Sequence, residues 1–246
     1  MNIIADTHMH TTASTHAYSS LQEMVHAAAE KGLYAVAITD HGCNLPGAPG
    51  KWYFHNLRVV PHILEGVLVL RGEEANVIDF DGNLDLDDDD HLDWIVASIH
   101  QPCMPPKKPT VEETTNLWLQ VAKNPRVNVI GHSGTAEYPY DFEAVIPEFA
   151  RNGKLVEFNE GTFLSRRKSI ANCKMIMEVC KKHAAPVIIN SDSHFSTQVG
   201  CFSNTLKLME EIGFPEELVV NARLDRFKAY LKQYSQVFND PLLSTD

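Results

Sequence analysis

Short apolar runs rich in Val and Ile alternate along the chain with longer segments of helical periodicity. Seven such runs lie at about residues 2–6, 34–39, 67–73, 94–99, 127–131, 154–159 and 186–190. Segments with helical spacing lie between or after them, at about residues 20–31, 56–65, 111–123, 141–151, 169–183, 203–212 and 223–235. A strand followed by a helix, repeated seven times, is typical of parallel βα units rather than of a sandwich. The pattern therefore predicts an α/β fold with parallel strands.

Residues at the element boundaries carry signals of their own. Ser19 and Ser20 can cap the helix that begins near residue 20, and Gly32 and Gly153 can end helices. No repeat, linker-like segment or shift in composition divides the 246 residues. We therefore expect one domain over residues 1–246.

The charge balance restricts the class of ligand. The chain has 21 basic and 32 acidic residues, which gives a formal charge of −11. A negative field repels long polyanions, so the balance disfavours duplex nucleic acid as a partner and favours a small molecule.

The cysteines and the first residues bear on where the protein acts. Its five cysteines are odd in number and form no Cys-x-x-Cys pair, which favours a reducing compartment. Residues 1–6 lack the basic start and long apolar stretch of a secretory signal, and no apolar run approaches the ~18 residues of a membrane span. We therefore expect a cytoplasmic protein with no membrane partner.

Side chains that can bind metal follow six of the seven apolar runs. The first run leads into Asp6-Thr7-His8-Met9-His10, the second into Thr39-Asp40-His41, the third into Gly72-Glu73-Glu74, the fourth into His100, the fifth into His132 and the seventh into Ser191-Asp192-Ser193-His194. In a parallel barrel these ends open on one face, so side chains about 190 positions apart would converge. Histidine accounts for only 12 of the 246 residues, so its repeated place just past a strand indicates a shared site.

Several of these residues also have an ordinary interpretation. His8 and His10 are two positions apart on an extended segment, so both imidazoles can face the barrel mouth, yet such a pair alone does not establish a metal site. His16 follows the first run and could be a solvated loop residue. Asp40 could orient His41 or simply cap a helix.

The third run ends in two carboxylates with different expected roles. Glu74 would be costly to bury without a cation or strong hydrogen bonds, which fits a bridging metal ligand. Strand alternation turns Glu73 to the other side, toward the surface or a salt bridge. Glycines before and just after His132 would let the backbone approach a crowded centre, although an ordinary turn has the same pattern.

The remaining histidines and the acidic run are not expected to bind metal. Five histidines lie in predicted helices, near their starts or in the acidic loop: His26, His55, His62, His91 and His183. The run Asp85-Leu86-Asp87-Asp88-Asp89-Asp90 lacks the glycine and terminal glutamate of a calcium loop, which favours a solvated loop. Cys43 lies two residues after His41 and is left outside the site.

The set Asp6-Thr7-His8-Met9-His10, Asp40-His41, Glu74, His100, His132 and Asp192-Ser193-His194 resembles the polymerase and histidinol phosphatase (PHP) superfamily. Longer stretches at residues 10–19, 38–42, 71–76 and 191–194 resemble its YcdX-type zinc-dependent phosphatase subgroup. The resemblance extends from residue 1 to about residue 235, with matching length and element order.

The resemblance implies a distorted (β/α)7 TIM-like barrel with three divalent metal ions at its C-terminal mouth. Nine ligands are implied, and every one of these positions has the expected residue type: His8, His10, Glu74 and Asp192 for one ion, Glu74, His100 and His132 for a second, and His16, His41 and His194 for a third. Glu74 would bridge two ions. Zinc is the expected metal, and donors without thiolate also suit manganese or iron better than calcium.

Four residues at three places depart from the family pattern. Ser133 stands where a proline usually follows the histidine of the fifth strand, and Cys43-Asn44 replaces a Pro-acidic pair. Glu160 adds an acidic residue near the mouth. These departures bear on the choice of substrate more than on metal binding.

The implied activity is hydrolysis of small phosphate monoesters by a phosphatase. Metal ions ~3.5–4 Å apart can activate water at neutral pH and clamp the oxygens of an in-line displacement. We therefore predict that metal-activated hydroxide, with no further catalytic side chain, attacks a small phosphorylated metabolite. Arg167, then Arg166 and more weakly Arg58, are predicted to bind its phosphate, although surface charge at a helix start is the ordinary interpretation.

Other functions stay open at this stage. A phosphodiesterase or nuclease of the same superfamily would use the same metals, but no basic, aromatic groove is evident. Hydrolysis of C–N bonds on a similar barrel would need an activated lysine or a set of four histidines and one aspartate, and the third histidine cluster argues against it. A non-catalytic, metal-dependent interaction protein is the remaining alternative, and a homo-oligomer is compatible with the sequence.

Overall fold

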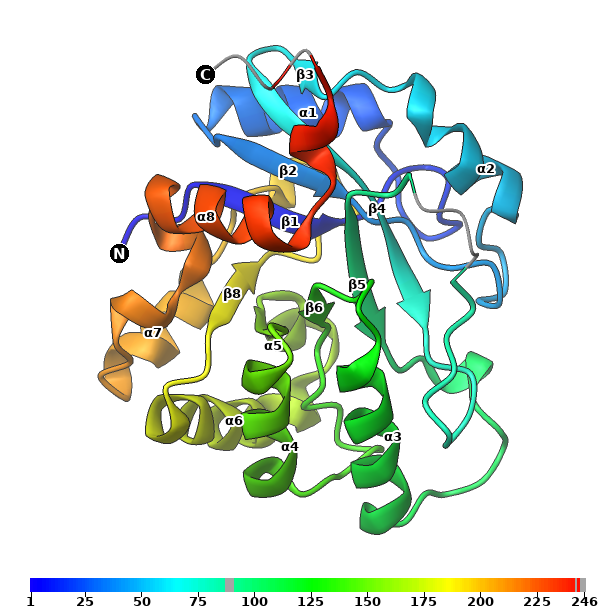
Figure 1. Cartoon of the computed structure of the whole chain (residues 1–246), viewed down its shortest axis with the longest axis vertical. Helices are drawn as coiled ribbons and strands as arrows, with labels where there is room; N and C mark the ends of the chain where they lie inside the picture. Colours follow the sequence, from blue (N-terminus) through cyan, green and yellow to red (C-terminus); the bar gives the residue numbers. More distant parts are fainter. Residues whose placement is uncertain (87–90, 242, 244–246) are drawn as a thin grey trace.

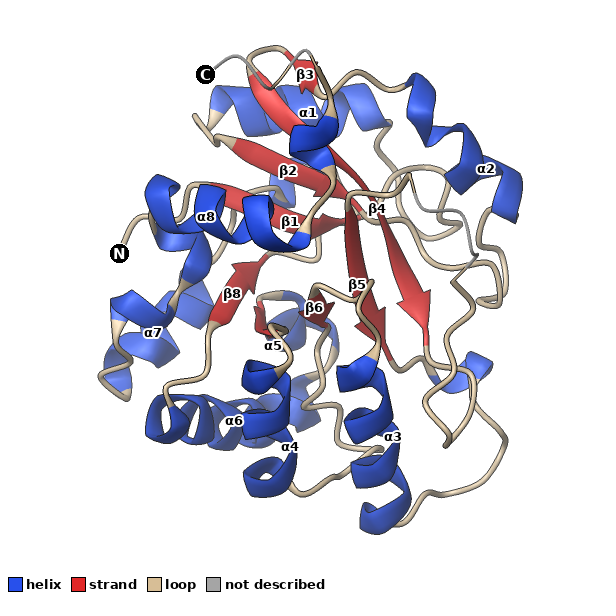
Figure 2. Cartoon of the chain, in the orientation of Figure 1, coloured by secondary structure: helices blue, strands red, loops and turns tan. Residues whose placement is uncertain are grey.

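Seven parallel strands form a sheet that nearly closes into a barrel in the computed structural model, which describes residues 1–86, 91–241 and 243 (Figures 1 and 2). The strands are β1 (Ala5–Met9), β2 (Ala35–Ile38), β4 (Val67–Asn76), β5 (Trp94–Ser98), β6 (Val129–Ile130), β7 (Leu155–Asn159) and β8 (Val187–Asn190), and they pair in this order. A short strand, β3 (Ile63–Leu64), pairs antiparallel with β4. The predicted α/β barrel of parallel strands is confirmed.

Helices surround the sheet, and most of them lie where the periodicity predicts. They are α1 (Leu21–Glu30), α2 (Lys51–Asn56), α3 (Val111–Lys123), α4 (Phe142–Arg151), α5 (Gly161–Ser165), α6 (Ile170–His183), α7 (Ser203–Glu211) and α8 (Leu224–Tyr234). Of the two serines that could cap α1, Ser20 is the cap, whereas Ser19 Oγ accepts a hydrogen bond from the Ser196 amide at 3.1 Å. Ser20 accepts a hydrogen bond from the Glu23 amide, and the Glu23 side chain accepts one from the Ser20 amide. Gly32 and Gly153 adopt φ of 69° and 71° just past their helices.

The predicted helix at residues 56–65 is wrong. The chain is helical over Lys51–Asn56, continues as a 3-10 turn over Leu57–Val59 and then enters β3. Pro61 disfavours a helix here because it restricts the preceding residue and lacks an N–H donor. Glu65 and Gly66, with φ of 51° and 78°, then form a two-residue hairpin turn between β3 and β4.

Strand β1 begins later than predicted and contains a bulge. Asp6 pairs with Val36 and Met9 with Ile38, so β1 has one residue more than β2 between these pairs. The extra residue reverses the side-chain alternation. Ala5 lies in the barrel interior, whereas three residues later His8 also faces inward, at the mouth.

The barrel closes between β1 and the segment after β8 through few backbone hydrogen bonds. The Asp192 amide donates to the His8 carbonyl at 3.0 Å, and the His10 amide to the Ser193 carbonyl at 2.8 Å. Below them, the Thr7 amide donates to the side chain of Asn190, to Oδ1 at 2.8 Å. This closure places the segment after β8 directly against the histidines of β1.

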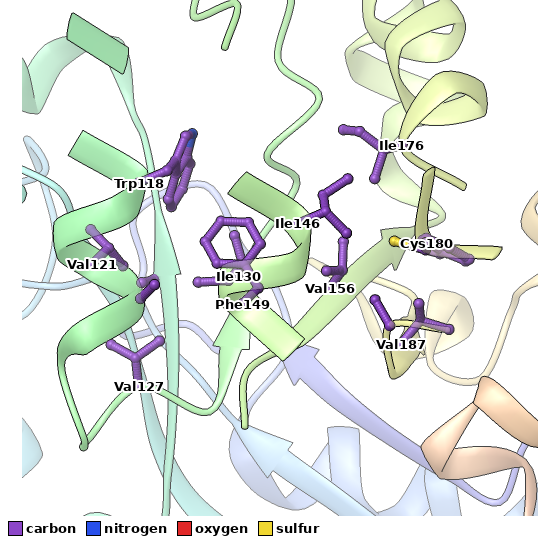
Figure 3. Close-up of a cluster of buried hydrophobic side chains, with 14 of the residues drawn as sticks. Trp118, Val121, Val127, Ile130, Ile146, Phe149, Val156, Ile176, Cys180 and Val187 are labelled. Atoms are coloured by element: carbon purple, nitrogen blue, oxygen red, sulfur yellow. The ribbon is translucent and has the colours of Figure 1, made fainter. Parts of the chain in front are cut away.

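Apolar side chains fill the lower barrel and the space behind the sheet. Trp94 and Leu70 lie in the interior cluster, which continues onto Phe227 of α8. A larger cluster lies between the sheet and α3, α4 and α6 and includes Trp118 and Phe149 (Figure 3). Close-packed layers of this kind hold the strands rigidly, so the polar residues at the mouth stand on a fixed base.

His62 joins distant segments on the N-terminal side of the strands. Its Nδ1 lies 2.6 Å from Asp240 Oδ2 and its Nε2 lies 3.0 Å from Asp93 Oδ2. Burial lowers the pKa of His62, but the hydrogen bonds with the two carboxylates outweigh burial and raise the pKa above its usual value.

This raised pKa predicts a pH-dependent stability. The stabilisation by protonated His62 is fully present below the unfolded pKa of ~6.5 and is lost as the pH rises through the folded pKa. Between about pH 6 and pH 9, we expect the free energy of unfolding to fall about 1 kcal/mol more in the wild type than in His62→Gln, as measured by urea denaturation. The same pH dependence in both proteins would contradict this assignment.

Candidate metal centre

Imidazoles and carboxylates from six of the parallel strands and the loops after them meet at the C-terminal ends of the strands. The structure brings together all nine predicted ligands: His8, His10, His16, His41, Glu74, His100, His132, Asp192 and His194. Most are buried; His100 and His194 are half-buried and His16 is exposed. The sequence places them far apart, and the parallel strands deliver them to one face.

Glu74 lies at the centre of this cluster. Its Oε1 is 3.0 Å from His132 Nε2, 3.2 Å from His8 Nε2 and 3.6 Å from His100 Nε2. Its Oε2 is 2.7 Å from His41 Nδ1 and 3.5 Å from His10 Nε2. Side chains alternate between the two faces of strand β4. Leu68 and Leu70 face the barrel interior, and Glu74 lies an even number of residues after them, so it faces the same side. A single carboxylate therefore contacts five imidazoles.

Further contacts join Asp192 and the outer histidines to the cluster. Asp192 Oδ1 lies 3.2 Å from His10 Nε2. The rings of His16, His41 and His194 are mutually close, with centroids 4.9 Å apart for His16 and His41 and 4.8 Å apart for His16 and His194. The residues predicted to bind the third ion thus form the outer edge of the same cluster.

The donor geometry fits divalent metal ions. Three buried atoms that face one another in the cluster, His8 Nε2, His41 Nδ1 and Glu74 Oε2, lie close to neighbouring polar atoms but make no contact with hydrogen-bond geometry among the described residues. Unpaired buried polar atoms are costly. The distances of about 3 Å between the Glu74 oxygens and the imidazole nitrogens suit ligands of one metal ion. In a tetrahedral zinc site with bonds of ~2.0–2.1 Å, two ligand atoms lie roughly 3.3 Å apart. Three triplets have all ligand atoms within 4.8 Å of one another: His10-His41-His194, His8-His10-Glu74 and His41-Glu74-His100.

The protonation states of Glu74, His10 and His100 favour ligation, whereas His8 must lose a proton to bind metal: burial lowers its pKa, but the carboxylates of Glu157 and Glu74 outweigh burial and raise the pKa well above its usual value. Burial acts to raise the pKa of Glu74, but the neighbouring imidazoles of His8 and His100 lower it well below its usual value. Burial lowers the pKa of His100 to about 3 and that of His10 well below its usual value. Ionised carboxylates and neutral imidazoles are the forms that bind metal ions.

Glu157, in β7, orients the cluster from below and was not predicted from the sequence. Its Oε1 accepts hydrogen bonds from His8 Nδ1 at 2.7 Å and from Asn190 Nδ2 at 2.9 Å. Its Oε2 accepts hydrogen bonds from the His132 amide at 2.8 Å and from Asn159 Nδ2 at 2.9 Å. A carboxylate on the far nitrogen fixes the tautomer and direction of a metal-binding imidazole. Strand alternation was the available signal, because Leu155 faces the interior and Glu157 has the same parity.

Asn76 plays a comparable part for His100. Its Oδ1 lies 2.7 Å from His100 Nδ1. Asp85 in turn accepts hydrogen bonds from the Asn76 amide and from Asn76 Nδ2, both at 2.7 Å. The expected solvated acidic loop is therefore wrong for Asp85, which is buried, while residues 87–90 lie outside the described part of the chain.

Both interpretations of Asp40 are replaced by a different role in the described structure. Its carboxylate accepts hydrogen bonds from the Thr11 amide and hydroxyl at 2.8 Å, from Ser14 Oγ at 2.7 Å and from Tyr53 Oη at 2.6 Å. It therefore ties the loop between β1 and α1, which carries His16, to helix α2.

Two acidic residues differ from their predicted places. Glu160 was expected near the mouth, but its carboxylate accepts the Asn204 amide at 3.0 Å and the Thr205 amide at 2.8 Å, at the start of α7. Glu73 faces away from Glu74 as predicted, yet it is buried rather than at the surface. Helices cover the outside of a barrel, so a side chain that points away from the mouth is still covered.

The backbone is unusual at two candidate ligands. His132 and Asp192 adopt φ of 25° and 57°, in the left-handed region that non-glycine residues seldom occupy. The predicted close approach beside His132 is present, since a Cβ at Gly131 would overlap Ser98 Oγ. Strain of this kind clusters at functional sites.

A cavity of about 300 Å³ opens over the cluster. Arg166 lines it, donating from Nη2 to Asp192 Oδ2 at 2.6 Å and to Asn159 Oδ1 at 2.9 Å. Arg167 and Arg58 are exposed and are not among the described residues that line the cavity, and Arg167 Nε donates to the Phe163 carbonyl at 3.3 Å. The sequence favoured Arg167, but the structure places Arg166 beside the cluster.

The barrel and its mouth define an α/β protein with a donor cluster capable of binding divalent metal ions. The PHP domain model matches residues 6–241 of the chain. Proteins named probable phosphatase from Acetivibrio thermocellus and Caldicellulosiruptor saccharolyticus are 44% and 41% identical to it, over 95% and 96% of this chain and 97% and 99% of their own lengths. The chain therefore belongs to the PHP domain family.

Solved structures share the fold at much lower identity. The histidinol phosphate phosphatase of Lactococcus lactis, crystallised with zinc, L-histidinol and phosphate, has a TM-score of 0.62 at 16% identity, covering 87% of this chain and 95% of that one. A chain in an archaeal ribonuclease P bound to mature tRNA has a TM-score of 0.58 at 9% identity, covering 96% and 94%. Because such different assemblies share the fold, the activity must be argued from the site.

No helix in the described part of the chain combines the length and apolar character needed to traverse a bilayer.

Proposed function

We propose that this PHP-family chain is a phosphatase that hydrolyses small phosphate monoesters at a centre of three divalent metal ions, with zinc as the expected metal. The observation that carries the proposal is the group of five imidazoles around the Glu74 carboxylate. The close relatives named probable phosphatases support the reaction class. The zinc and phosphate in the Lactococcus lactis enzyme are those of a protein with the same fold.

The residues of the chain have separable tasks in this proposal. Metal ions bound to the nine donors would supply an activated water nucleophile and neutralise the charge of the phosphoryl group. Glu74 and Asp192 balance part of the metal charge, and Glu157 holds His8 in its ligating direction. Arg166 lines the cavity, so its guanidinium can donate to a phosphate oxygen.

The test compares metal-depleted and reloaded protein on two related esters. We expect chelation to abolish hydrolysis of p-nitrophenyl phosphate and zinc or manganese to restore it, with little hydrolysis of bis(p-nitrophenyl) phosphate. Preference for the diester would favour the phosphodiesterase alternative. Monoester hydrolysis that survives complete metal removal, or none by the metal-loaded protein, would exclude the proposed function.

Arg166 provides a sharper prediction within this function. Replacing it by glutamine removes the guanidinium from the cavity, and we expect KM for p-nitrophenyl phosphate to rise roughly tenfold in saturating zinc. The adjacent Arg167→Gln is the matched control, because Arg167 is exposed and donates to the Phe163 carbonyl; its KM should change less than about twofold. Equal effects of the two substitutions would remove Arg166 from the phosphate site.

We also propose that the protein acts in the cytoplasm on a small phosphorylated metabolite. All five cysteines are free in the structure, which suits a reducing compartment.

A further inference from the structure

A groove adjoins the metal cavity along the loop between β5 and α3. Its volume is about 810 Å³, compared with about 300 Å³ for the cavity over the donor cluster. Gln101 and Pro102 line both spaces. The groove therefore adjoins the cavity in which a phosphoryl group would be held, and it is large enough for a drug-sized molecule.

Two chain segments lead directly from candidate metal ligands to the walls of the groove. After His100, a 3-10 turn over Gln101–Cys103 leads to Met104. After His132, two successive turns, closed by backbone hydrogen bonds of 3.2 and 3.1 Å, lead to Tyr138. The groove is thus a fixed extension of the metal site rather than a separate surface feature.

The walls of the groove are mainly apolar. Four prolines line it, at positions 102, 105, 106 and 109, together with Met104 and Tyr138. Proline supplies no backbone N–H, so this wall has few donors for the hydroxyl groups of a sugar or polyol. Apolar lining with few polar groups is typical of sites that bind apolar parts of ligands.

The charges at the groove do not single out a second anionic group. Lys107 forms an ion pair with Glu113 and lies 4.6 Å from the ring centroid of Phe80. The other charged lining residues are Lys108 and Glu137, both exposed and opposite in sign. The groove as a whole is therefore close to neutral.

From the shared lining and the apolar wall we propose that the groove binds the alcohol portion of the phosphate ester, and that this portion is extended and mainly apolar. The proposal rests on the proposed function, because the phosphate must be held over the donor cluster for the alcohol to enter the groove. A long apolar alcohol gains affinity from each methylene group removed from water, whereas a short or polyhydroxylated alcohol leaves the groove unfilled.

The n-alkyl phosphates from ethyl to octyl test this proposal, because their leaving groups differ in length with little change in acidity. With the zinc-loaded full-length protein, kcat/KM is expected to rise roughly two- to fourfold per added methylene until the groove is filled. Glycerol phosphate should react no faster than propyl phosphate.

Two proline substitutions show where the length dependence arises. Pro106 is an exposed residue of the groove wall, so Pro106→Asp should flatten the rise of kcat/KM with chain length. Pro125 is exposed between α3 and β6, at the other end of the barrel, so Pro125→Asp should keep the wild-type slope.

The outcomes separate this inference from the proposed function. Hydrolysis of ethyl phosphate with no rise along the series would overturn the inference alone, and so would a wild-type slope in Pro106→Asp. No hydrolysis of any of these esters by the metal-loaded protein would overturn the proposed function and the inference with it.

Discussion

Replacing Glu74 by glutamine is expected to lower kcat for phosphate monoesters roughly a thousandfold or more and to reduce the metal content of the purified protein. The carboxylate lies within 3.6 Å of five imidazoles. An amide of the same shape removes the negative charge that bridges the cluster and places an NH₂ group where a cation would bind. Steady-state kinetics and elemental analysis of the same preparation measure both effects.

Glu73 provides the matched control for this substitution. It is the adjacent residue of β4, is also buried and faces away from Glu74. Glu73→Gln should keep the wild-type metal content even where it lowers the melting temperature. A Glu74→Gln protein with full metal content and kcat within about tenfold of wild type would show that Glu74 does not bridge metal ions.

The convergence of the candidate ligands at the barrel mouth could be predicted because it follows from backbone topology. Parallel strands open on one face whatever their loops contain, so His41, His100 and His132 were placed from their position just past an apolar run. Placing His8 was less direct. Its strand carries a bulge, and only the spacing to His10 indicated that both rings face inward.

The residues that orient the candidate ligands could not be found in the same way. Glu157 acts on His8 across 149 positions of sequence, and a glutamate within a strand is equally compatible with a salt bridge. Asp85 supports Asn76 from an acidic run whose composition indicates solvent exposure. Such side-chain partners depend on tertiary packing, which hydrophobic periodicity does not specify.

Local errors in the fold have the same origin. Strand β3 has two residues, too few for a period of two to be visible against a helical pattern. The decisive signal at this point was Pro61 followed by the Glu65-Gly66 turn. At this point the proline and the turn residues decide the local structure, and the spacing of the apolar residues does not. The longer helices α3 and α6 were predicted correctly because their periodicity extends over several turns.

Glu157→Gln is expected to weaken zinc binding by roughly ten- to a hundredfold without removing any ligand. Both carboxylate oxygens of Glu157 accept two hydrogen bonds each. In either orientation of the glutamine, its NH₂ group would face two donors, and the ring of His8 or the backbone at His132 would have to move. Zinc affinity is measured by competition with a chelator, and activity lost at limiting zinc should return when zinc is in excess.

Glu160→Gln separates this positioning effect from a loss of folding stability. Glu160 lies three residues later and also accepts several hydrogen bonds, from Asn204 and Thr205 at the start of α7. Its replacement should lower the melting temperature and leave zinc affinity unchanged, because its carboxylate faces a helix rather than the donor cluster. If both variants lost zinc affinity equally, the weaker binding would reflect general destabilisation. A selective loss in Glu157→Gln would show that the inner face of β7 sets the direction of the metal ligands.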